Sequence, residues 1–267
     1  MIGTTVSHYH IIEEIGHGAM GRVFKARDTH SGRFAALKVV AEKYLENVEI
    51  LKRFEREGLA ISSLKHPHIC NVYEIGAWQN QPFIAMELLR GETVRDRLRR
   101  KELFAEDACF EIARQISGAL EAAHGAGILH RDIKPANIFL DQEGNTKLLD
   151  FGMAKIKKPQ PARALAASAA TMATVAMSFA TIPGTIVGTI AYMAPEQAKG
   201  LTVDARADLY SLGVVLHEMA SGELPLGGMP RAARLPARLV PILTRLIAAD
   251  PAARYQSAGE LRAVLAR

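Results

Sequence analysis

The stretch His130-Arg131-Asp132-Ile133-Lys134-Pro135-Ala136-Asn137, followed by Asp150-Phe151-Gly152, is the most informative part of this 267-residue chain. One carboxylate, Asp132, can orient a hydroxyl group and take its proton. Asn137 and Asp150 supply oxygen ligands of the kind that Mg²⁺ prefers. Because such a string with a correctly spaced second aspartate is very improbable by chance, it predicts a phosphoryl-transfer site.

Upstream, residues 16–21 (GHGAMG) form a G-x-G-x-x-G motif. In a dinucleotide-binding fold this motif joins a strand to a helix. Here Arg22-Val23-Phe24 continues as a strand, which favours a hairpin whose backbone amides approach phosphate oxygens, with Val23 against the base. From this motif alone, a hairpin with a purely structural role stays open.

A lysine follows in the apolar run Ala35-Ala36-Leu37-Lys38. A buried ammonium group is costly unless it is paired with an anion. Glu57, in a helix predicted over 47–64, is the expected partner. The alternative from this motif alone is a lysine at the end of a strand that reaches solvent.

Hydrophobic periodicity divides the chain into two parts. Alternating runs with short turns predict strands over 8–16, 22–28, 33–40 and 71–88, with a turn at Thr29–Gly32. A mainly β part therefore ends near Met86. After Gly91, helical spacing predicts helices at Glu106–Gly127, Asp204–Ser221 and Leu235–Ala249.

Together with Ala194-Pro195-Glu196, these motifs stand in the order typical of eukaryotic-type (Hanks-type) serine/threonine protein kinases. The chain resembles that family from about Ser7 to its C-terminus, and its bacterial members most of all. The resemblance implies an α+β bilobal fold. The N-lobe would span about 1–86, the hinge about 87–91 and the C-lobe about 92–267.

The resemblance also implies the roles of individual residues. Lys38, paired with Glu57, would hold the α/β-phosphates of ATP, and Asp132 would be the catalytic base. Lys134 would contact the transferred phosphate, and Thr189 would touch Asp132 and Lys134. Asn137 and Asp150 would bind Mg²⁺. The implied nucleotide site comprises Ile15, Gly16, Gly18, Gly21, Val23, Ala36, Lys38, Met86 as gatekeeper, Glu87, Leu89, Asn137 and Asp150.

Lys134 and Thr189 match the family's serine/threonine pattern, so the implied substrates are protein Ser and Thr hydroxyls, including the chain's own. Further along, Asp208 resembles a buried aspartate that anchors the catalytic loop. Glu196 and Arg254 resemble an ion pair that fixes the end of the activation segment.

Two features depart from the family pattern. The activation segment, 150–196, is unusually long and rich in Ala, Thr and Ser. Because Arg131 precedes the catalytic aspartate, we expect activation by phosphorylation, with Thr181 and Thr185 as the candidate sites. The region 225–241, where the family places a helix called αG, is shortened.

These departures keep an alternative open, a pseudokinase-like regulatory module that binds nucleotide without transferring phosphate. Against it, the lysine and both aspartates whose loss marks such proteins are present: Lys38, Asp132 and Asp150. A kinase of small molecules fits less well, because Ala194-Pro195-Glu196 and the Gly188-Thr189 ledge belong to kinases of peptides.

Charge and composition suggest the remaining partners and the compartment. The net charge of +5 is scattered rather than gathered into a tract, so we expect no nucleic-acid partner. Positions 164–195 carry no charge and are long enough to span a bilayer, but they are mostly small residues, and we expect no membrane segment. Two cysteines without metal-site spacing suit the cytoplasm, although a longer parent chain could be membrane-tethered.

Overall fold

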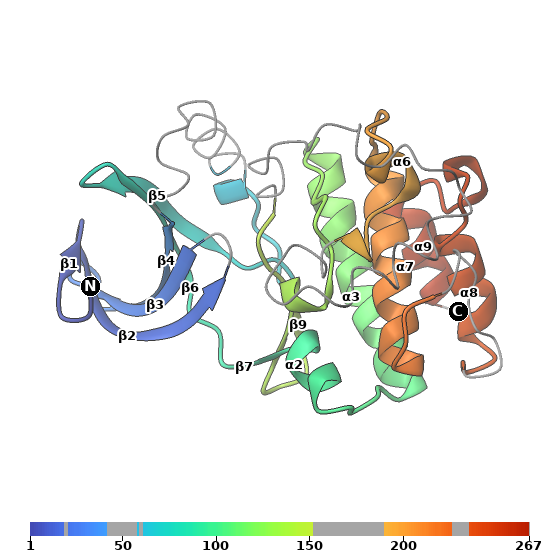
Figure 1. Cartoon of the computed structure of the whole chain (residues 1–267), viewed down its shortest axis with the longest axis horizontal. Helices are drawn as coiled ribbons and strands as arrows, with labels where there is room; N and C mark the ends of the chain where they lie inside the picture. The colour runs from blue at the N-terminus through green and yellow to red at the C-terminus, as the bar shows by residue number, and fades with distance from the viewer. Residues whose placement is uncertain (19–20, 42–57, 59–60, 152–189, 226–234, 267) are drawn as a thin grey trace. The chain divides into compact units, whose positions relative to one another are not determined.

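A computed structural model describes residues 1–18, 21–41, 58, 61–151, 190–225 and 235–266 (Figure 1). The chain forms two compact units, Met1–Gly91 and Glu92–Arg267, and each is described by itself. Most of the helix predicted over 47–64 lies outside the described residues, and so does Glu57. Most of the uncharged segment and of the shortened region 225–241 also lies outside them.

The N-terminal unit is a curled antiparallel sheet in the strand order β1-β2-β3-β4-β6-β5 (Figure 1). The strands are β1 (Thr5–Val6), β2 (Tyr9–Gly18), β3 (Gly21–Asp28), β4 (Phe34–Val40), β5 (Val72–Trp78) and β6 (Gln81–Glu87). The predicted hairpins are therefore confirmed. Gln79 and Asn80 both have positive φ, of 49° and 61°, as a two-residue hairpin turn requires.

Alternation along the strands separates the two faces of this sheet. One face carries the buried core, which includes Phe24, Leu37 and Phe83. Because successive side chains of a strand point to opposite faces, Val23, Ala36 and Lys38 lie on the other face. The Tyr9 hydroxyl of β2 donates a hydrogen bond to Glu74 Oε2 of β5 at 3.1 Å, so the curl brings these two strands together.

The C-terminal unit is mainly helical. It contains a small sheet of β7 (Gly91–Thr93), β8 (Ile138–Asp141) and β9 (Thr146–Leu148). Its helices are α2 (Val94–Arg99), α3 (Glu106–Gly125), α6 (Pro195–Ala198), α7 (Ala205–Ser221), α8 (Leu239–Leu246) and α9 (Ala258–Leu265), with 3₁₀ turns η2 (Pro135–Asn137) and η7 (Pro251–Ala253).

Helices α3 and α7 form the centre of this unit and pack against each other, against α9 and against α8 (Figure 1). Helices α7 and α8 approach each other closely at Gly213. A Cβ at this position would lie 2.6 Å from Leu246 Cβ, so there is no room for a side chain. Asp204 caps the start of α7 through the Arg206 N–H. Among the described helices, no span reaches the length and apolarity needed to cross a membrane.

The predicted helix at Leu235–Ala249 was wrong in its extent. Helix α8 begins at Leu239 and ends at Leu246, and residues 235–238 precede it as turns. Leu235 is buried without being helical, so its place in the periodic pattern reflects packing alone. The predictions for α3 and α7 were correct to within two residues at each end.

Candidate active site

The loop between α3 and β8 is held by a buried carboxylate from α7. Asp208 is 1% exposed and accepts hydrogen bonds from the backbone N–H groups of His130 (2.9 Å) and Arg131 (2.7 Å). His124 Nε2 lies 2.9 Å from the same carboxylate. The three contacts fix the backbone just before Asp132. The predicted anchoring contact of Asp208 is present.

His130 ties this loop to the segment that ends at Asp150. Its Nδ1 accepts a hydrogen bond from the Asp132 N–H at 3.2 Å, so Nε2 carries the proton and donates to the Leu149 carbonyl at 2.8 Å. The imidazole also packs on the Phe151 ring, with centroids 4.6 Å apart. The histidine thus links the two sequence motifs through its side chain.

Asp132 is buried and is positioned by two neighbours in sequence. Lys134 Nζ donates to its Oδ2 at 2.7 Å. The Asn137 amide donates to the Asp132 carbonyl at 2.8 Å and to Oδ2 at 3.3 Å. Within the described part of the chain, the buried Oδ1 has no hydrogen-bond partner. A buried acceptor without a donor is costly, and a substrate hydroxyl would satisfy it.

Two residues of this region have a strained backbone. Arg131 and Asp150 are non-glycine residues with φ of 62° and 56°, in the left-handed region. Such conformations cost about 1–3 kcal/mol each and persist only where the surroundings enforce them. Here Asp208 enforces the first through the Arg131 N–H, and the strain coincides with the motifs that predict chemistry.

Asn137 and Asp150 suit a divalent cation in their donor chemistry. Because the Asn137 amide nitrogen is committed to Asp132, the carbonyl Oδ1 of Asn137 is left to accept a ligand. The Asn137 backbone carbonyl also accepts the Leu149 N–H at 2.8 Å, which ties the turn η2 to the residue before Asp150. An amide oxygen and a carboxylate form the oxygen set that Mg²⁺ takes when phosphates complete its shell.

In the N-terminal unit, the predicted nucleotide residues share one face of the sheet. Lys38 is buried in β4 at 7% exposure and stands opposite Val23 of β3, while Ala36 stands opposite Met86 of β6. Ile15 lies near the tip of the β2–β3 hairpin with an exposed side chain. The structure thus places Val23, Ala36 and Lys38 together on the sheet's non-core face.

The three loop glycines differ in what the protein itself requires of them. A Cβ on Gly21 would lie 1.9 Å from the Val39 carbonyl oxygen, and its φ is 148°, so only glycine fits there. A Cβ on Gly18 would have nothing within 4 Å, and one on Gly16 would only touch Val23. Packing in the described residues therefore gives no reason for Gly16 or Gly18. Open backbone beside a hairpin tip suits a close ligand.

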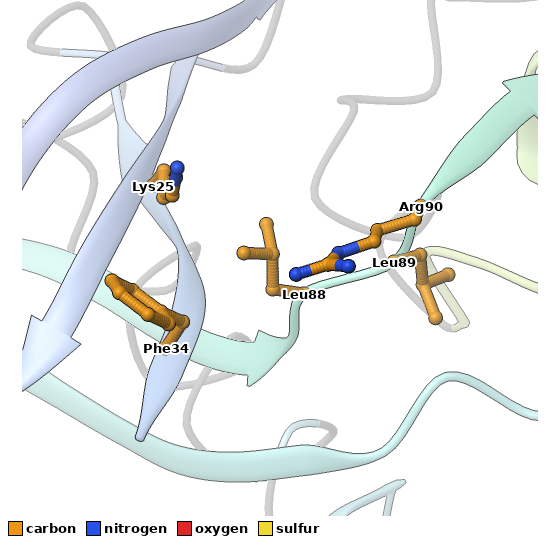
Figure 2. A pocket seen from close by; sticks show the side chains of 5 residues that line it. All are labelled: Lys25, Phe34, Leu88, Leu89 and Arg90. Atoms are coloured by element: carbon orange, nitrogen blue, oxygen red, sulfur yellow. The ribbon is translucent and has the colours of Figure 1, made fainter. Parts of the chain in front are cut away.

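The hinge segment borders a hollow of about 350 Å³ on the same unit (Figure 2). It is lined by Lys25 and Phe34 from the strands and by Leu88, Leu89 and Arg90. Of these residues, only Leu89 was predicted from the sequence to contact the nucleotide. Strand alternation could have predicted Lys25 and Phe34. Each lies two positions from Val23 or Ala36 in the same strand and so shares its face of the sheet.

Glu87, at the end of β6, is fixed by neighbours within its own unit. Its backbone N–H donates to the Asn71 carbonyl at 2.9 Å, and its carboxylate accepts from the Asn71 side chain at 3.1 Å. These contacts orient the first hinge residue. The remaining predicted site residues, Glu57, Thr181, Thr185 and Thr189, lie outside the described residues.

Behind the loop, Glu196 and Arg254 form the predicted ion pair. The two terminal nitrogens of the Arg254 guanidinium, Nη1 and Nη2, donate to the Glu196 carboxylate at 2.7 and 2.8 Å. The Arg254 side chain is fully buried. Burial alone would raise the pKa of Glu196, but the hydrogen bonds from Arg254 outweigh it and hold the pKa below its ordinary value. Gln197 donates to the Arg131 carbonyl at 2.9 Å, which links this region to the loop.

Comparisons with known proteins agree with this geometry. A family model described as protein kinase domain matches residues 9–255. A probable serine/threonine-protein kinase of Clostridium perfringens is 33% identical over 282 residues, covering 98% of this chain and 38% of that protein. The serine/threonine-protein kinase PknB of Mycobacterium tuberculosis is 35% identical over 290 residues, covering 99% of this chain and 44% of PknB.

This chain therefore spans less than half the length of these curated relatives. Among solved structures, the crystal structure of the Mycobacterium tuberculosis PknI kinase domain matches with a TM-score of 0.79 and 28% identity, covering 100% of this chain and 98% of that one. The chain belongs to the protein kinase family, and it is similar to serine/threonine-protein kinases of bacteria.

Proposed function

We propose that this chain transfers the γ-phosphate of ATP, with Mg²⁺, to Ser and Thr hydroxyls of proteins, with Asp132 as the catalytic base. The observation that carries the proposal is the environment of this carboxylate. Its Oδ2 is held by Lys134 at 2.7 Å, whereas its buried Oδ1 has no partner among the described residues. An incoming hydroxyl would donate to Oδ1 and give up its proton there.

The neighbours of Asp132 have separate tasks in this proposal. Lys134 holds the carboxylate in its rotamer and offers positive charge to the transferred phosphate, as the family resemblance implies. Asn137 and Asp150 hold Mg²⁺, which when bound neutralises charge on the ATP phosphates. Asp208 and His130 keep these groups in place through the loop backbone.

For the nucleotide, the proposal assigns Lys38 to the phosphates and the loop glycines to close backbone approach. Val23 and Ala36 would contact the adenine base, with backbone groups of Glu87 and Leu89 as its hydrogen-bond partners. The burial of Lys38 supports its role, because a buried ammonium group needs an anion nearby. ATP is supplied in the cytoplasm, and we propose that compartment for the activity.

Regulation by phosphorylation is the second part of the proposal. Arg131 is strained, and its buried Nε has no hydrogen-bond partner within the described residues. A phosphate on the activation segment would supply the missing acceptor through a charge-assisted hydrogen bond. Thr181 and Thr185 are the proposed autophosphorylation sites.

Mass spectrometry after incubation with ATP and Mg²⁺ tests this second part. We expect phosphate at Thr181 or Thr185, and an Arg131→Ala variant that can be phosphorylated there by wild-type chain but is not activated. Phosphate found only outside 160–189 would contradict it.

The acceptor chemistry is tested with peptides that differ in one residue. A peptide pool carrying Ser, Thr or Tyr at the acceptor position, incubated with radiolabelled ATP, should gain label on Ser and Thr. Predominant label on Tyr would exclude the serine/threonine assignment while leaving phosphoryl transfer intact. The same experiment with ADP in place of ATP should give no transfer.

A further inference from the structure

One end of the N-terminal unit carries a cluster of titratable side chains that the proposed kinase chemistry does not use. His8, Asp28 and His30 each offer a ligand atom, and these atoms all lie within 4.8 Å of one another. His8 Nε2 is also 3.3 Å from Glu74 Oε2 and 3.7 Å from Asp28 Oδ1. The four residues come from the turn between β1 and β2, the end of β3, the turn after it and β5.

We propose that His8, Asp28, His30 and Glu74 form a binding site for a divalent transition-metal ion of the Zn²⁺ type. Two imidazoles and two carboxylates are a ligand set that Zn²⁺ accepts. Metal–ligand distances of about 2.0–2.2 Å put the ligand atoms of a tetrahedral site about 3.3–3.6 Å apart. The two distances from His8 Nε2 are close to that spacing.

The two ring nitrogens of His8 have different neighbours. Ser7 Oγ lies 3.2 Å from Nδ1, and Nε2 faces the carboxylates of Asp28 and Glu74. If Nδ1 carries the proton and donates to Ser7, Nε2 can bind a metal ion. The Ser31 hydroxyl and the backbone N–H groups of His30 and Ser31 donate to the Asp28 carboxylate and hold it beside His8. A cation bound at Nε2 would be attracted by both carboxylates.

Hydrogen bonds within the unit hold the backbone around the cluster in place. The Thr29 N–H and hydroxyl both donate to the His8 carbonyl at 2.9 Å, which joins the two turns that carry His8 and His30. The Tyr9 hydroxyl donates to Glu74 Oε2 at 3.1 Å and orients the fourth ligand. Arg33 Nε donates to Ser31 Oγ at 3.3 Å, and its guanidinium lies over the Tyr73 ring.

One adjustment is needed for the site to close. The rings of His8 and His30 are stacked, with centroids 4.4 Å apart and planes at 5°, so both cannot point at one ion without a rotation. His30 is exposed, and its ring can turn about its side-chain bonds at little cost. Bound metal would then join turns and a strand that are far apart in sequence, and it would stabilise the unit by mass action.

The test is a calorimetric titration of the chain, without a histidine tag and with millimolar Mg²⁺ present, by Zn²⁺ alone. We expect one Zn²⁺ per chain and a rise in Tm on binding. His30→Ala and Glu74→Gln should each lower the affinity at least about 10-fold, and His8→Ala at least as much. The matched control is His10→Ala, an exposed histidine of β2 outside the cluster.

Titration with Co²⁺ identifies the ligands, because a site without cysteine shows visible d–d bands and lacks the near-ultraviolet thiolate band. The proposal is overturned if the wild-type chain takes up no Zn²⁺ in the micromolar to millimolar range. It is equally overturned if His10→Ala weakens binding as much as His30→Ala, or if the thiolate band appears. His30→Ala replaces an exposed side chain, so the result does not depend on whether His8→Ala folds.

Discussion

Arg254, fully buried, holds the Glu196 carboxylate with two hydrogen bonds of 2.7 and 2.8 Å, and also donates to three backbone carbonyls. The pair joins the end of the activation segment to the turn before α9. Removing one partner leaves the other charge buried and unpaired. We therefore expect loss of either residue to destabilise the C-terminal unit strongly.

Arg254→Ala should lower the free energy of unfolding by about 3–5 kcal/mol, measured by urea denaturation. The matched control is Arg262→Ala, which breaks an exposed pair with Glu121 and should cost less than about 1 kcal/mol. Equal effects of the two substitutions would mean that burial of the Glu196–Arg254 pair has no energetic consequence.

The pH dependence of the same pair has a definite sign. Because the pKa of Glu196 in the folded chain lies below its ordinary value of 4.5, its stabilisation is fully present above pH 4.5 and is lost as the pH falls through the folded-state pKa. The difference in unfolding free energy between wild type and Glu196→Gln should therefore shrink below pH 4.5. A difference that stays constant down to pH 3 would contradict the assignment.

Glu218 should show the opposite behaviour. Burial raises the pKa of this carboxyl group above 4.5, and a hydrogen bond from the Tyr192 hydroxyl at 2.6 Å offsets this only in part. Its favourable contribution is present below pH 4.5 and is lost as the pH rises through the raised pKa. The change in Tm that Glu218→Gln causes relative to wild type should therefore be more favourable at pH 8 than at pH 4. The exposed control Glu143→Gln should show no such difference between the two pH values.

The loop glycines separate a structural role from a functional one. Gly21→Ala should lower Tm by several degrees, because its Cβ would overlap the Val39 carbonyl. Gly18→Ala should leave Tm unchanged, since nothing lies within 4 Å, but should raise KM for ATP severalfold if the backbone approaches the phosphates there. Unchanged KM in Gly18→Ala would exclude close approach at this residue.

Asp208 links stability to catalysis. Asp208→Ala removes the acceptor for the buried N–H of His130, at about 1–3 kcal/mol, and for the partly buried N–H of Arg131. We expect kcat to fall at least tenfold, because the loop that carries Asp132 is released. Asp208→Asn keeps one carbonyl oxygen as an acceptor, so its kcat should lie between those of wild type and Asp208→Ala. A variant Asp208→Ala with wild-type kcat would show that the loop holds its geometry without this anchor.

Much of the fold could be predicted because the signals were local. The β2–β3 and β5–β6 hairpins follow from alternation and turn residues, and α3 and α7 follow from their apolar stripes. The start of α8 was misplaced because Leu235 is buried by packing outside a helix, which periodicity cannot distinguish from helical burial.

The candidate site was predictable where motif residues are neighbours in sequence, as with Asp132, Lys134 and Asn137. The orphaned Asp132 Oδ1, the strain at Arg131 and Asp150 and the His8–Glu74 contact depend on which atoms meet in space. No spacing rule contains that information, and Lys25 and Phe34 were missed although strand parity could have found them.

The most direct test of the central claim is autophosphorylation of purified chain with radiolabelled ATP and Mg²⁺, comparing wild type with Asp132→Ala and Lys38→Met, and with Glu143→Gln as a folded control. We expect label on wild type and control, and a rate lower by about 10²–10³ or more in both active-site variants at unchanged Tm. Label on Asp132→Ala and Lys38→Met at the wild-type rate would contradict it.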